Sequence, residues 1–397
     1  MNAPHSPREA FETESRRRPA PRRQSAPTER PARARRPAQG RSTDGMYDYD
    51  ANSSQQLSTV RKAAELLGRL VETIGPVEPE FRMVDYGCGP GTSAVETVRP
   101  VVEAYRRLSP HGRLAVCHAD QPGNDWNGLF ALASGPRGYG AGDPALRREA
   151  AVGSFYRPMV AAGSVTLGTC FTASHWFSRA VSVDSPGTVS VYDLTGPARA
   201  QVAAQAEADW TTFLRRRSEE LEPGGRLLVS GLATPSDARD LQEVVEKGNG
   251  YLAAVQTVAE SMAAEGLLDR ALLDRFVFPS WFRTAEELRQ PLEQVPALRR
   301  ALEIESLTVV PATEKREDTF AAHLNDPARY AALVAGLVRG FADSTLRSQL
   351  FGPSAANAAA AGRLAEEFFG RLTGLIEAAP ERYTAIYWIS TLVLRRR

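Results

Sequence analysis

Two short stretches of the sequence carry residues that could bind a nucleoside. In "VDYGCGPGT", Asp85, Gly87, Gly89 and Gly91 stand where a buried run turns into a helical pattern. Glycines at such a turn let the backbone approach a ligand with no Cβ in the way. Asp120 ends the next apolar run, "GRLAVCHAD", where a carboxylate can accept hydrogen bonds from ribose hydroxyls. The two stretches together predict a nucleoside-ligand site.

The spacing of the acidic residues bears on which nucleoside is bound. Asp120 lies about thirty residues beyond the glycine loop, whereas the dinucleotide fingerprint expects its acidic residue about twenty residues on. Asp85, which precedes the loop, also suits a methyl-donor site, where a sulfonium and an ammonium are bound instead of a pyrophosphate. The alternative for Asp85 is a plain turn at the end of a strand.

The stretch "ADQPGNDWNGLF", from Ala119 to Phe130, is unusual for a turn. It holds the Pro, Gly, Asn and Asp that turns require. It then continues at once with the aromatic side chains of Trp126 and Phe130, which a turn does not need. It is therefore either an ordinary strand exit or the rim of a ligand pocket.

Strand and helix patterns alternate along most of the chain. Apolar residues recur at three- and four-residue steps from Asn52 to Ile74, which predicts an amphipathic helix. Strands are predicted over residues 81–87, 112–120, 164–174 and 224–232, and helices over residues 92–108 and 198–221. This alternation favours an α/β fold with a parallel sheet that helices cover on both faces.

The C-terminal part reads as mostly helical, with two exceptions. "LEIESLTVV" and "YTAIYWISTLVL" are rich in β-branched and aromatic residues and could close the far edge of the sheet. The predicted organisation is a leader over 1–44, a core over 45–235, a helical cap over 236–298 and 312–378, and closing strands over 299–311 and 379–397.

The composition is that of a soluble globular protein, with 43% apolar and 24% charged residues. No apolar run is long enough to cross a bilayer, and the start lacks the apolar region of a secretory signal. Cys88, Cys117 and Cys170 match no zinc spacing and fit a reducing compartment. We therefore expect a cytoplasmic protein without a membrane partner.

The N-terminal segment differs from the rest of the chain. Residues 1–41 hold eleven Arg and four Glu, a net charge of +7, so the remainder carries −6 of the total of +1. The segment is rich in Pro and has few large apolar residues, which predicts disorder. An arm for nucleic acid or an anionic membrane is the alternative. The slightly acidic body favours a solvated leader, and we expect no nucleic-acid partner.

Six stretches, in order along the chain, resemble the signatures of the plant-type carboxyl methyltransferases, the salicylate/benzoate/jasmonate/theobromine (SABATH) family. They are "YDYDANSSQQ", "DYGCGPGTS", "ADQPGNDWNGLF", "GSFYR", "SHWFS" and "FLRRRSEELEPGGRLL". The resemblance implies a Rossmann-like class I methyltransferase sheet with a mostly helical cap over the acceptor pocket. It implies S-adenosylmethionine as methyl donor, a small carboxylic acid as acceptor, and a homodimer, which is common in the family. It also makes Ala119–Phe130 a ribose-binding strand end and a pocket-supporting helix.

The resemblance also assigns site residues by position. Those for S-adenosylmethionine are Tyr49, Ser53, Gln56, Asp85, Gly87, Cys88, Gly89, Gly91, Ser93, Asp120, Gln121, Ser154 and Phe155. His175, Trp176 and Gln56 would position the acceptor, the first two through ring N–H donors. Phe171, Thr172, Tyr251, Phe276 and Trp281, with Phe282, are candidate pocket walls.

Some of these residues have structural alternatives, and some depart from the family pattern. Ser53 could cap the first helix, and Phe155 or His175 could simply belong to the core. Thr172 stands where the family often has Tyr, which suggests an acceptor of different shape. Val277 replaces the polar residue that helps some members bind magnesium, so we expect no metal.

The chemistry implied is an in-line displacement at a methyl carbon. A carboxylic acid with a pKa of about 4 is already ionised at neutral pH, so no general base is needed. The expected product is the methyl ester of a mostly apolar, aromatic or indolic acid. N- or O-methylation of a small heterocycle is the first alternative, although it would usually need a base. A NAD(P)-dependent oxidoreductase is the second.

Overall fold

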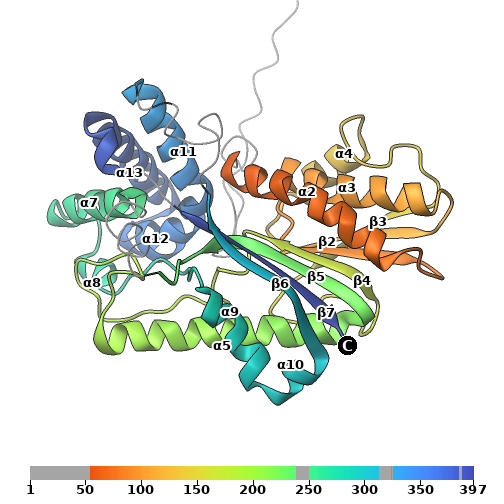
Figure 1. The fold of residues 1–397 in the computed structure, drawn as a ribbon. Helices are drawn as coiled ribbons and strands as arrows, with labels where there is room; N and C mark the ends of the chain where they lie inside the picture. Colours follow the sequence, from red (N-terminus) through yellow and green to blue (C-terminus); the bar gives the residue numbers. More distant parts are fainter. Residues whose placement is uncertain (1–53, 238–249, 313–322, 324, 384–386) are drawn as a thin grey trace, which may run out of the picture. The chain divides into compact units, whose positions relative to one another are not determined.

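The computed structural model describes residues 54–237, 250–312, 323, 325–383 and 387–397, all within one compact unit. Strands and helices alternate along most of this length (Figure 1). The strands are β1 (Phe81–Tyr86), β2 (Leu114–Asp120), β3 (Leu146–Val152), β4 (Val165–Phe171), β5 (Leu221–Ala233), β6 (Leu302–Pro311) and β7 (Trp388–Arg396). The helices are α2 (Ser54–Ile74), α3 (Thr92–Leu108), α4 (Trp126–Ser134), α5 (Gly196–Glu220), α7 (Gly250–Ala264), α8 (Arg270–Leu273), α9 (Ala285–Gln294), α10 (Pro296–Ala301), α11 (Pro327–Leu346), η4 (Arg347–Phe351), α12 (Gly352–Ser354), α13 (Ala358–Ala378) and η5 (Pro380–Tyr383).

The seven strands form one sheet in the order β3-β2-β1-β4-β5-β7-β6. The first five are parallel, and β7 runs antiparallel between β5 and β6. The chain passes from β1 outward to β2 and β3, and later from β4 outward in the opposite direction. The carboxyl ends of β1 and β4 therefore lie side by side at a topological switch point, where open α/β sheets bind their ligands.

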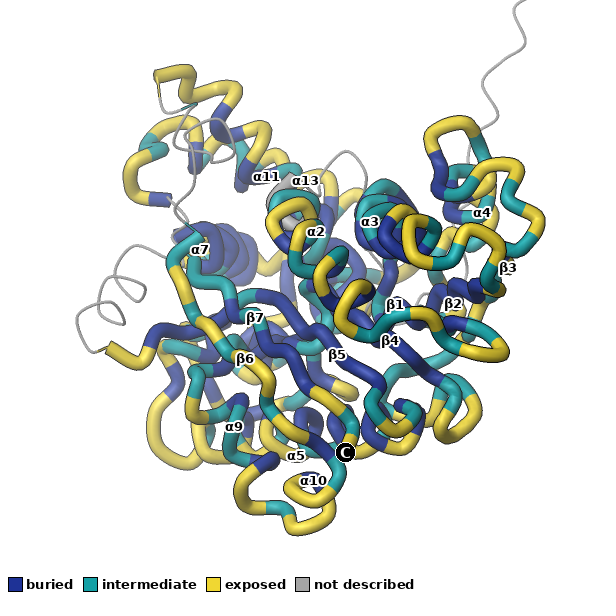
Figure 2. Tube along the Cα trace, turned by 45° about the vertical axis from the view of Figure 1, so that its right-hand side comes forward, coloured by how far each residue is buried: buried dark blue, intermediate teal, exposed yellow. Residues whose placement is uncertain are grey.

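Apolar side chains alternate between the two faces of the sheet. Phe81 and Met83 of β1 pack with α2 and α3, whereas Val84 and Tyr86 pack with α5. Figure 2 shows the central strands β1, β4, β5 and β7 as mainly buried and β6 as largely exposed. Helices therefore cover both faces, and the α/β class expected from the sequence is confirmed.

The strand β3 is absent from the sequence-based prediction. It is parallel to β2 and forms one edge of the sheet. Its sequence, Leu-Arg-Arg-Glu-Ala-Ala-Val, has only Leu146 buried. An edge strand that exposes most of its side chains lacks the apolar pattern by which buried strands are recognised.

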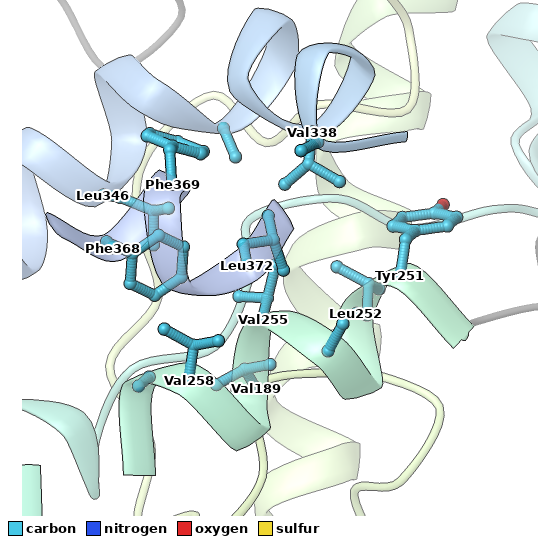
Figure 3. Close-up of a cluster of buried hydrophobic side chains, with 14 of the residues drawn as sticks. Val189, Tyr251, Leu252, Val255, Val258, Val338, Leu346, Phe368, Phe369 and Leu372 are labelled. Carbon is cyan, nitrogen blue, oxygen red and sulfur yellow. The ribbon is translucent and has the colours of Figure 1, made fainter. Parts of the chain in front are cut away.

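A second apolar core lies beside the sheet and is built from α7, α8, α11, η4 and α13. Figure 3 shows Val255, Leu346 and Leu372 within it, and Tyr251 at its margin with the hydroxyl directed away. The sequence-based division also places α9 and the first half of α10 in the cap. In the structure, Leu292 of α9 packs instead in the cluster that contains α5 and the sheet. The domain boundaries themselves remain a prediction.

Candidate active site

The loop after β1 has a backbone shape that requires glycine. Gly87 and Gly89 have φ angles of +73° and +66°, a region that other residues adopt at a cost. The amides of Gly87 and Cys88 both donate to the Ala119 carbonyl at the end of β2, at 2.7 and 3.3 Å. A Cβ built on Gly87 would lie 2.4 Å from the Ala173 Cβ, so the loop passes close to the segment that follows β4.

The Asp120 carboxylate is oriented by two backbone donors. Its Oδ2 accepts from the Gly89 amide at 2.6 Å, and its Oδ1 accepts from the Gln121 amide at 2.7 Å. Each carboxylate oxygen can accept a second hydrogen bond. Asp120 and Gln121 both line an open cleft of about 670 Å³ at the switch point. The carboxylate could therefore accept two neighbouring hydroxyls there.

Asp85 is a buried carboxyl at the end of β1. It is 2% exposed and accepts a hydrogen bond of 2.7 Å from the Thr169 hydroxyl. Burial raises the pKa of Asp85 to about 7, the Thr169 hydrogen bond opposes this rise, and the charge of Asp120 adds to it. A desolvated carboxyl of this kind gains most from a nearby cation, such as an ammonium group.

Phe155 forms the opposite side of the same cleft. Its ring packs edge-on against Phe213 of α5 at 5.7 Å and faces the position that a Cβ on Gly87 would take. Ser154 does not line the cleft. Its hydroxyl and carbonyl accept from the amides of Tyr156 and Arg157, so it makes the turn that positions Phe155.

A buried ion pair holds this loop in place. Arg217 of α5, whose side chain is fully buried, pairs with Glu220 at 2.9 Å and donates to the Phe155 and Arg157 carbonyls. Glu220 in turn accepts from the Tyr86 hydroxyl at 2.7 Å and from the Met159 amide. This network joins the stretches "GSFYR" and "FLRRRSEELEPGGRLL" in space.

Several residues that the sequence predicts to bind the nucleoside ligand lie away from the cleft or outside the described residues. Cys88 packs in a small core with Leu129, and Ser93 is buried inside α3. Gly91 caps α3. Tyr49 and Ser53 lie outside the described residues, as does the side chain of Gln56, whose backbone belongs to α2.

A second, mostly apolar cavity adjoins this cleft. Segments far apart in the sequence meet around it, and none of the described residues that line it is Lys or Arg. The lining residues are Thr59, Thr172, His175, Trp176, Leu232, Tyr251, Leu252, Phe278, Ser280, Phe282, Leu337, Phe341, Tyr387 and Ile389. Such a cavity suits a small ligand with a large apolar surface.

His175 and Trp176 stand together on the loop after β4 and line this second cavity. The His175 ring contacts Phe282 edge-on at 5.3 Å, and its carbonyl accepts from the Trp281 amide at 2.9 Å. Burial, with the charge of Arg283, lowers the pKa of His175 to about 3, so the imidazole is neutral at physiological pH. Both side chains line the cavity, so a ligand bound there could contact their ring nitrogens.

Three residues line both cavities: Thr172, Trp176 and Phe341. The two spaces therefore meet at this point, and a group could pass directly from a ligand in one to a ligand in the other. Thr172 has a φ of 47°, an uncommon conformation for a β-branched residue. This turn carries the chain from β4 into the loop of His175 and Trp176.

The predicted pocket walls are only partly at the cavity. Tyr251 and Thr172 line it, as does Phe282, whereas Phe171 lines the neighbouring cleft. The other two predicted walls pack elsewhere. Phe276 lies in the apolar core of the cap, and Trp281 donates to Glu287 at 3.1 Å while the Arg199 guanidinium covers its ring.

Phe341 and Phe278 are cavity residues that the sequence reasoning missed. Phe341 lies on α11, contacts Phe278 and Tyr251 edge-on, and reaches both cavities. Its only sequence signal is an apolar position in an amphipathic segment, which does not distinguish a cavity wall from core. Among the described residues there is no group of three or more His, Cys, Asp or Glu side chains that could hold a metal ion, and none of the described helices is long and apolar enough to cross a membrane.

The loop geometry predicts a specific effect of Gly87→Ala. The new Cβ would meet Ala173 at 2.4 Å, in addition to the strain at positive φ. We expect the Kd for S-adenosylhomocysteine to rise roughly tenfold or more, because overpacking of this size costs about 1–3 kcal/mol. Isothermal titration calorimetry measures the change.

Gly75→Ala is a matched control for that variant. Gly75 has a nearly identical φ of +78°, but no atom lies within 4 Å of the position that its Cβ would take, and it follows α2 away from the cleft. Gly75→Ala should lower the free energy of unfolding and leave the Kd unchanged. Equal Kd values for the two variants would argue that the glycine loop does not contact the ligand.

Comparisons with known proteins give a consistent result. A family model described as SAM dependent carboxyl methyltransferase matches residues 38–396. Jasmonate O-methyltransferase of Arabidopsis thaliana is 26% identical over 286 residues, which cover 63% of this chain and 72% of that protein. Loganic acid O-methyltransferase of Catharanthus roseus is 25% identical, with 63% of this chain and 70% of that protein covered.

Two further comparisons concern the fold and the acceptor. The solved structure of loganic acid methyltransferase with SAH has a TM-score of 0.70 and 19% identity, and covers 89% of this chain and 98% of that one. It shows the same fold. A probable 7-methylxanthine methyltransferase of Camellia ptilophylla is 27% identical, with 63% of this chain and 73% of that protein covered. The relatives thus include proteins named for carboxylic acids and for a nitrogen heterocycle.

Proposed function

Because the chain belongs to the family of S-adenosylmethionine-dependent carboxyl methyltransferases, we propose that it forms the methyl ester of a small, mostly apolar, aromatic or indolic carboxylic acid. The observation that carries this proposal is the meeting of two cavities at Thr172, Trp176 and Phe341. One cavity has the polar groups that a nucleoside donor requires, and the other is apolar apart from a few neutral donors and acceptors.

The residues of the cleft, with the buried Asp85 that does not line it but lies two residues before Gly87, fit S-adenosylmethionine, which supplies an electrophilic methyl group. Gly87 lines the cleft with backbone alone, and the Asp120 carboxylate, oriented by two backbone amides, could accept from ribose hydroxyls. Asp85 would compensate the ammonium group of the methionine end, and Phe155 would pack against the adenine. Tyr49, Ser53 and Gln56 keep their predicted roles as proposals.

In the acceptor cavity, positioning is the main task of the protein. His175 and Trp176 would each donate a ring N–H to the carboxylate and aim one oxygen at the methyl group. Holding two reactants in line can supply on the order of 7–11 kcal/mol in favourable intramolecular cases. Neutral donors suit this role, because they orient the carboxylate without removing as much of its nucleophilicity as a cation in direct contact would.

The properties of His175 weigh against N-methylation, the first alternative. A ring nitrogen of a heterocycle usually has to lose a proton, which requires a base with a pKa near the working pH. The pKa of His175 is lowered to about 3, so this imidazole is a weak base. A carboxylate needs no proton removed. The second alternative, a NAD(P)-dependent oxidoreductase, does not agree with the family to which the chain belongs.

The test is methyl transfer from labelled S-adenosylmethionine to a panel of aromatic, indolic and aliphatic acids. Each acid is paired with its amide, and phenol and xanthine acceptors are run beside them. We expect label in a base-labile methyl ester for at least one aromatic or indolic acid and for no amide. The carboxyl proposal would be refuted if the protein bound the donor, formed no ester from any acid, and transferred label to a xanthine or a phenol.

A further inference from the structure

Arg283 is a buried cation next to the acceptor cavity, although it does not line it. It is 5% exposed and follows Phe282, whose ring contacts His175. One guanidinium nitrogen donates to the Ser174 carbonyl at 2.9 Å, and another donates to the Ala206 carbonyl at 3.0 Å. The guanidinium also lies over the Trp210 ring, 5.1 Å from its centre.

These contacts tie the acceptor loop to the rest of the molecule. Ser174 directly precedes His175 in the loop after β4, and Ala206 lies in the middle of α5. Arg283 therefore bridges the loop to the long helix that supports the sheet. Because its carbonyl also accepts from the Thr234 amide after β5, three separate parts of the fold fix its position.

The charge of Arg283 is compensated only at a distance. No carboxylate lies within ion-pair distance of it among the residues that the structure describes. Tyr156, Glu287 and Asp209 interact with it electrostatically, and the two carboxylates also serve other donors. Asp209 accepts from the Ser178 amide, and Glu287 accepts from the Trp281 ring. Burial of a cation without a close anion is costly, which suggests that the charge is retained for a purpose.

The field of this cation reaches the part of the cavity where His175 stands. Burial lowers the pKa of His175, and the charge of Arg283, which donates to the carbonyl of the adjacent Ser174, lowers it further. No Lys or Arg is among the described residues that line the cavity. A positive potential in a space of low dielectric constant favours an anion over a neutral group of the same shape.

We propose that Arg283 is a positioning and specificity-determining residue, which holds the loop of His175 and Trp176 against α5 and makes the acceptor cavity selective for an anionic carboxylate. This inference rests on the proposed function and deepens it, because it names the device that distinguishes an acid from a neutral heterocycle or amide. Arg283 does not touch the acceptor, so it acts through the loop and through its field.

The experiment compares the binding of the best acid and of its primary amide, in the presence of S-adenosylhomocysteine, to three proteins: wild type, Arg283→Lys and Arg283→Gln. We expect the ratio of amide Kd to acid Kd to fall roughly ten- to a hundredfold in Arg283→Gln. Arg283→Lys keeps the charge and should retain most of the ratio. With methyl transfer as the readout, the loss should appear mainly in KM for the acid.

Two controls separate this effect from a general loss of structure. Binding of S-adenosylhomocysteine should be unchanged in the Arg283 variants. Arg226→Gln removes another buried arginine, which pairs with Glu305 at 2.9 Å on the sheet, and should lower stability without changing the acid–amide ratio. In Arg283→Gln, the His175 imidazole should titrate at a higher pH by NMR, a change that a merely structural role would not produce.

A further measurement on the wild type does not depend on any variant folding. A buried charge is screened little by salt, so the acid–amide ratio should hold from about 50 to about 500 mM salt, a range over which the Debye length falls severalfold. A ratio that collapses with salt, or one that Arg283→Gln leaves unchanged, would overturn this inference alone. A wild type that methylates no acid would instead overturn the proposed function.

Discussion

His175→Ala is expected to reduce kcat/KM for the best acid by roughly a hundredfold or more, since misplaced reactants lose about that much rate. The Kd for S-adenosylhomocysteine should stay unchanged, because the imidazole lines the acceptor cavity and not the donor cleft. Trp176→Phe, which removes the ring N–H and keeps an aromatic ring, should give a smaller loss. Steady-state kinetics and calorimetry on the same preparations measure both quantities.

Two conservative variants identify which nitrogen of His175 donates. The side-chain amide of Asn reaches the position of Nδ1, and that of Gln reaches the position of Nε2. One of His175→Asn and His175→Gln should therefore recover part of the activity lost in His175→Ala. Because the pKa of His175 is about 3, the imidazole should cause no step in the pH–rate profile from about pH 5.5 to about pH 8.5, a window in which it stays neutral.

His118 is a matched control for these variants. It is also a fully buried histidine with a pKa lowered by burial, to about 4, but its ring bonds to the Tyr139 hydroxyl at 2.7 Å, outside the acceptor cavity. His118→Gln should lower the free energy of unfolding and leave the acid specificity as it is. Full turnover by His175→Ala would favour the alternative in which this histidine only packs the core.

Asp85→Asn is expected to weaken donor binding by roughly a hundredfold or more, because a neutral amide replaces the buried carboxylate that we propose compensates the ammonium group of the donor. In the wild type, the pKa of Asp85 is raised to about 7, so the donor affinity should fall as the pH drops below 7 and level off above it. Binding near pH 6 should release a proton. Calorimetry in buffers of different ionisation enthalpy detects that release, which Asp85→Asn should abolish.

The raised pKa of Asp85 also affects the stability of the ligand-free protein. Donor affinity should increase as the pH rises, whereas this stability should decrease. The folded-state pKa of Asp85, about 7, lies above the unfolded value of about 3.9, so between these pH values the folded state binds more protons. The contribution of Asp85 to stability is therefore full below about pH 4 and is lost as the pH rises to about 7. At pH 8, Asp85→Asn should raise the free energy of unfolding by about 2–4 kcal/mol, as measured by urea denaturation.

Asp120→Asn is the control for the proton release. It removes a carboxylate that lines the cleft, which Asp85 does not, and should also weaken donor binding, but it keeps Asp85 and hence the pH dependence. The pH midpoint of the change in donor affinity should move to a lower value in Asp120→Asn, because the charge of Asp120 contributes to the raised pKa of Asp85. Equal proton release by wild type and Asp85→Asn would show that another group titrates on binding.

Local patterns in the sequence were sufficient for the donor side of the site. The glycine loop and Asp120 each lie at the end of a buried strand, and adjacent parallel strands bring such ends together at one edge of the sheet. Of the residues assigned to the donor, Gly87, Gly89, Asp120, Gln121 and Phe155 line the cleft, whereas Asp85, Cys88 and Ser154 do not, and the binding roles remain predictions. The strand β3 could not, because an exposed edge strand carries no apolar period.

The acceptor side was decided by tertiary structure. Its walls come from the end of β5, the 278–282 segment, α11 and the start of β7, which are separated by tens of residues or more. The local sequence does not indicate which aromatic side chains of such a segment face the cavity. Phe278 and Phe282 line it. Phe276 and Trp281 pack into two separate apolar clusters instead.

The position of the Arg283 charge was likewise decided by tertiary structure. In the sequence it is one of many arginines on a chain with a net charge of +1, and nothing marks it as buried or as a neighbour of His175. The sequence by itself determined the family and the methyl donor, and it predicted His175 and Trp176 as acceptor-positioning residues, because these inferences depend on short motifs at strand ends. Tertiary structure decided the cavity walls and the field inside the cavity, because burial and Coulomb interactions depend on distances between segments that only the folded chain brings together.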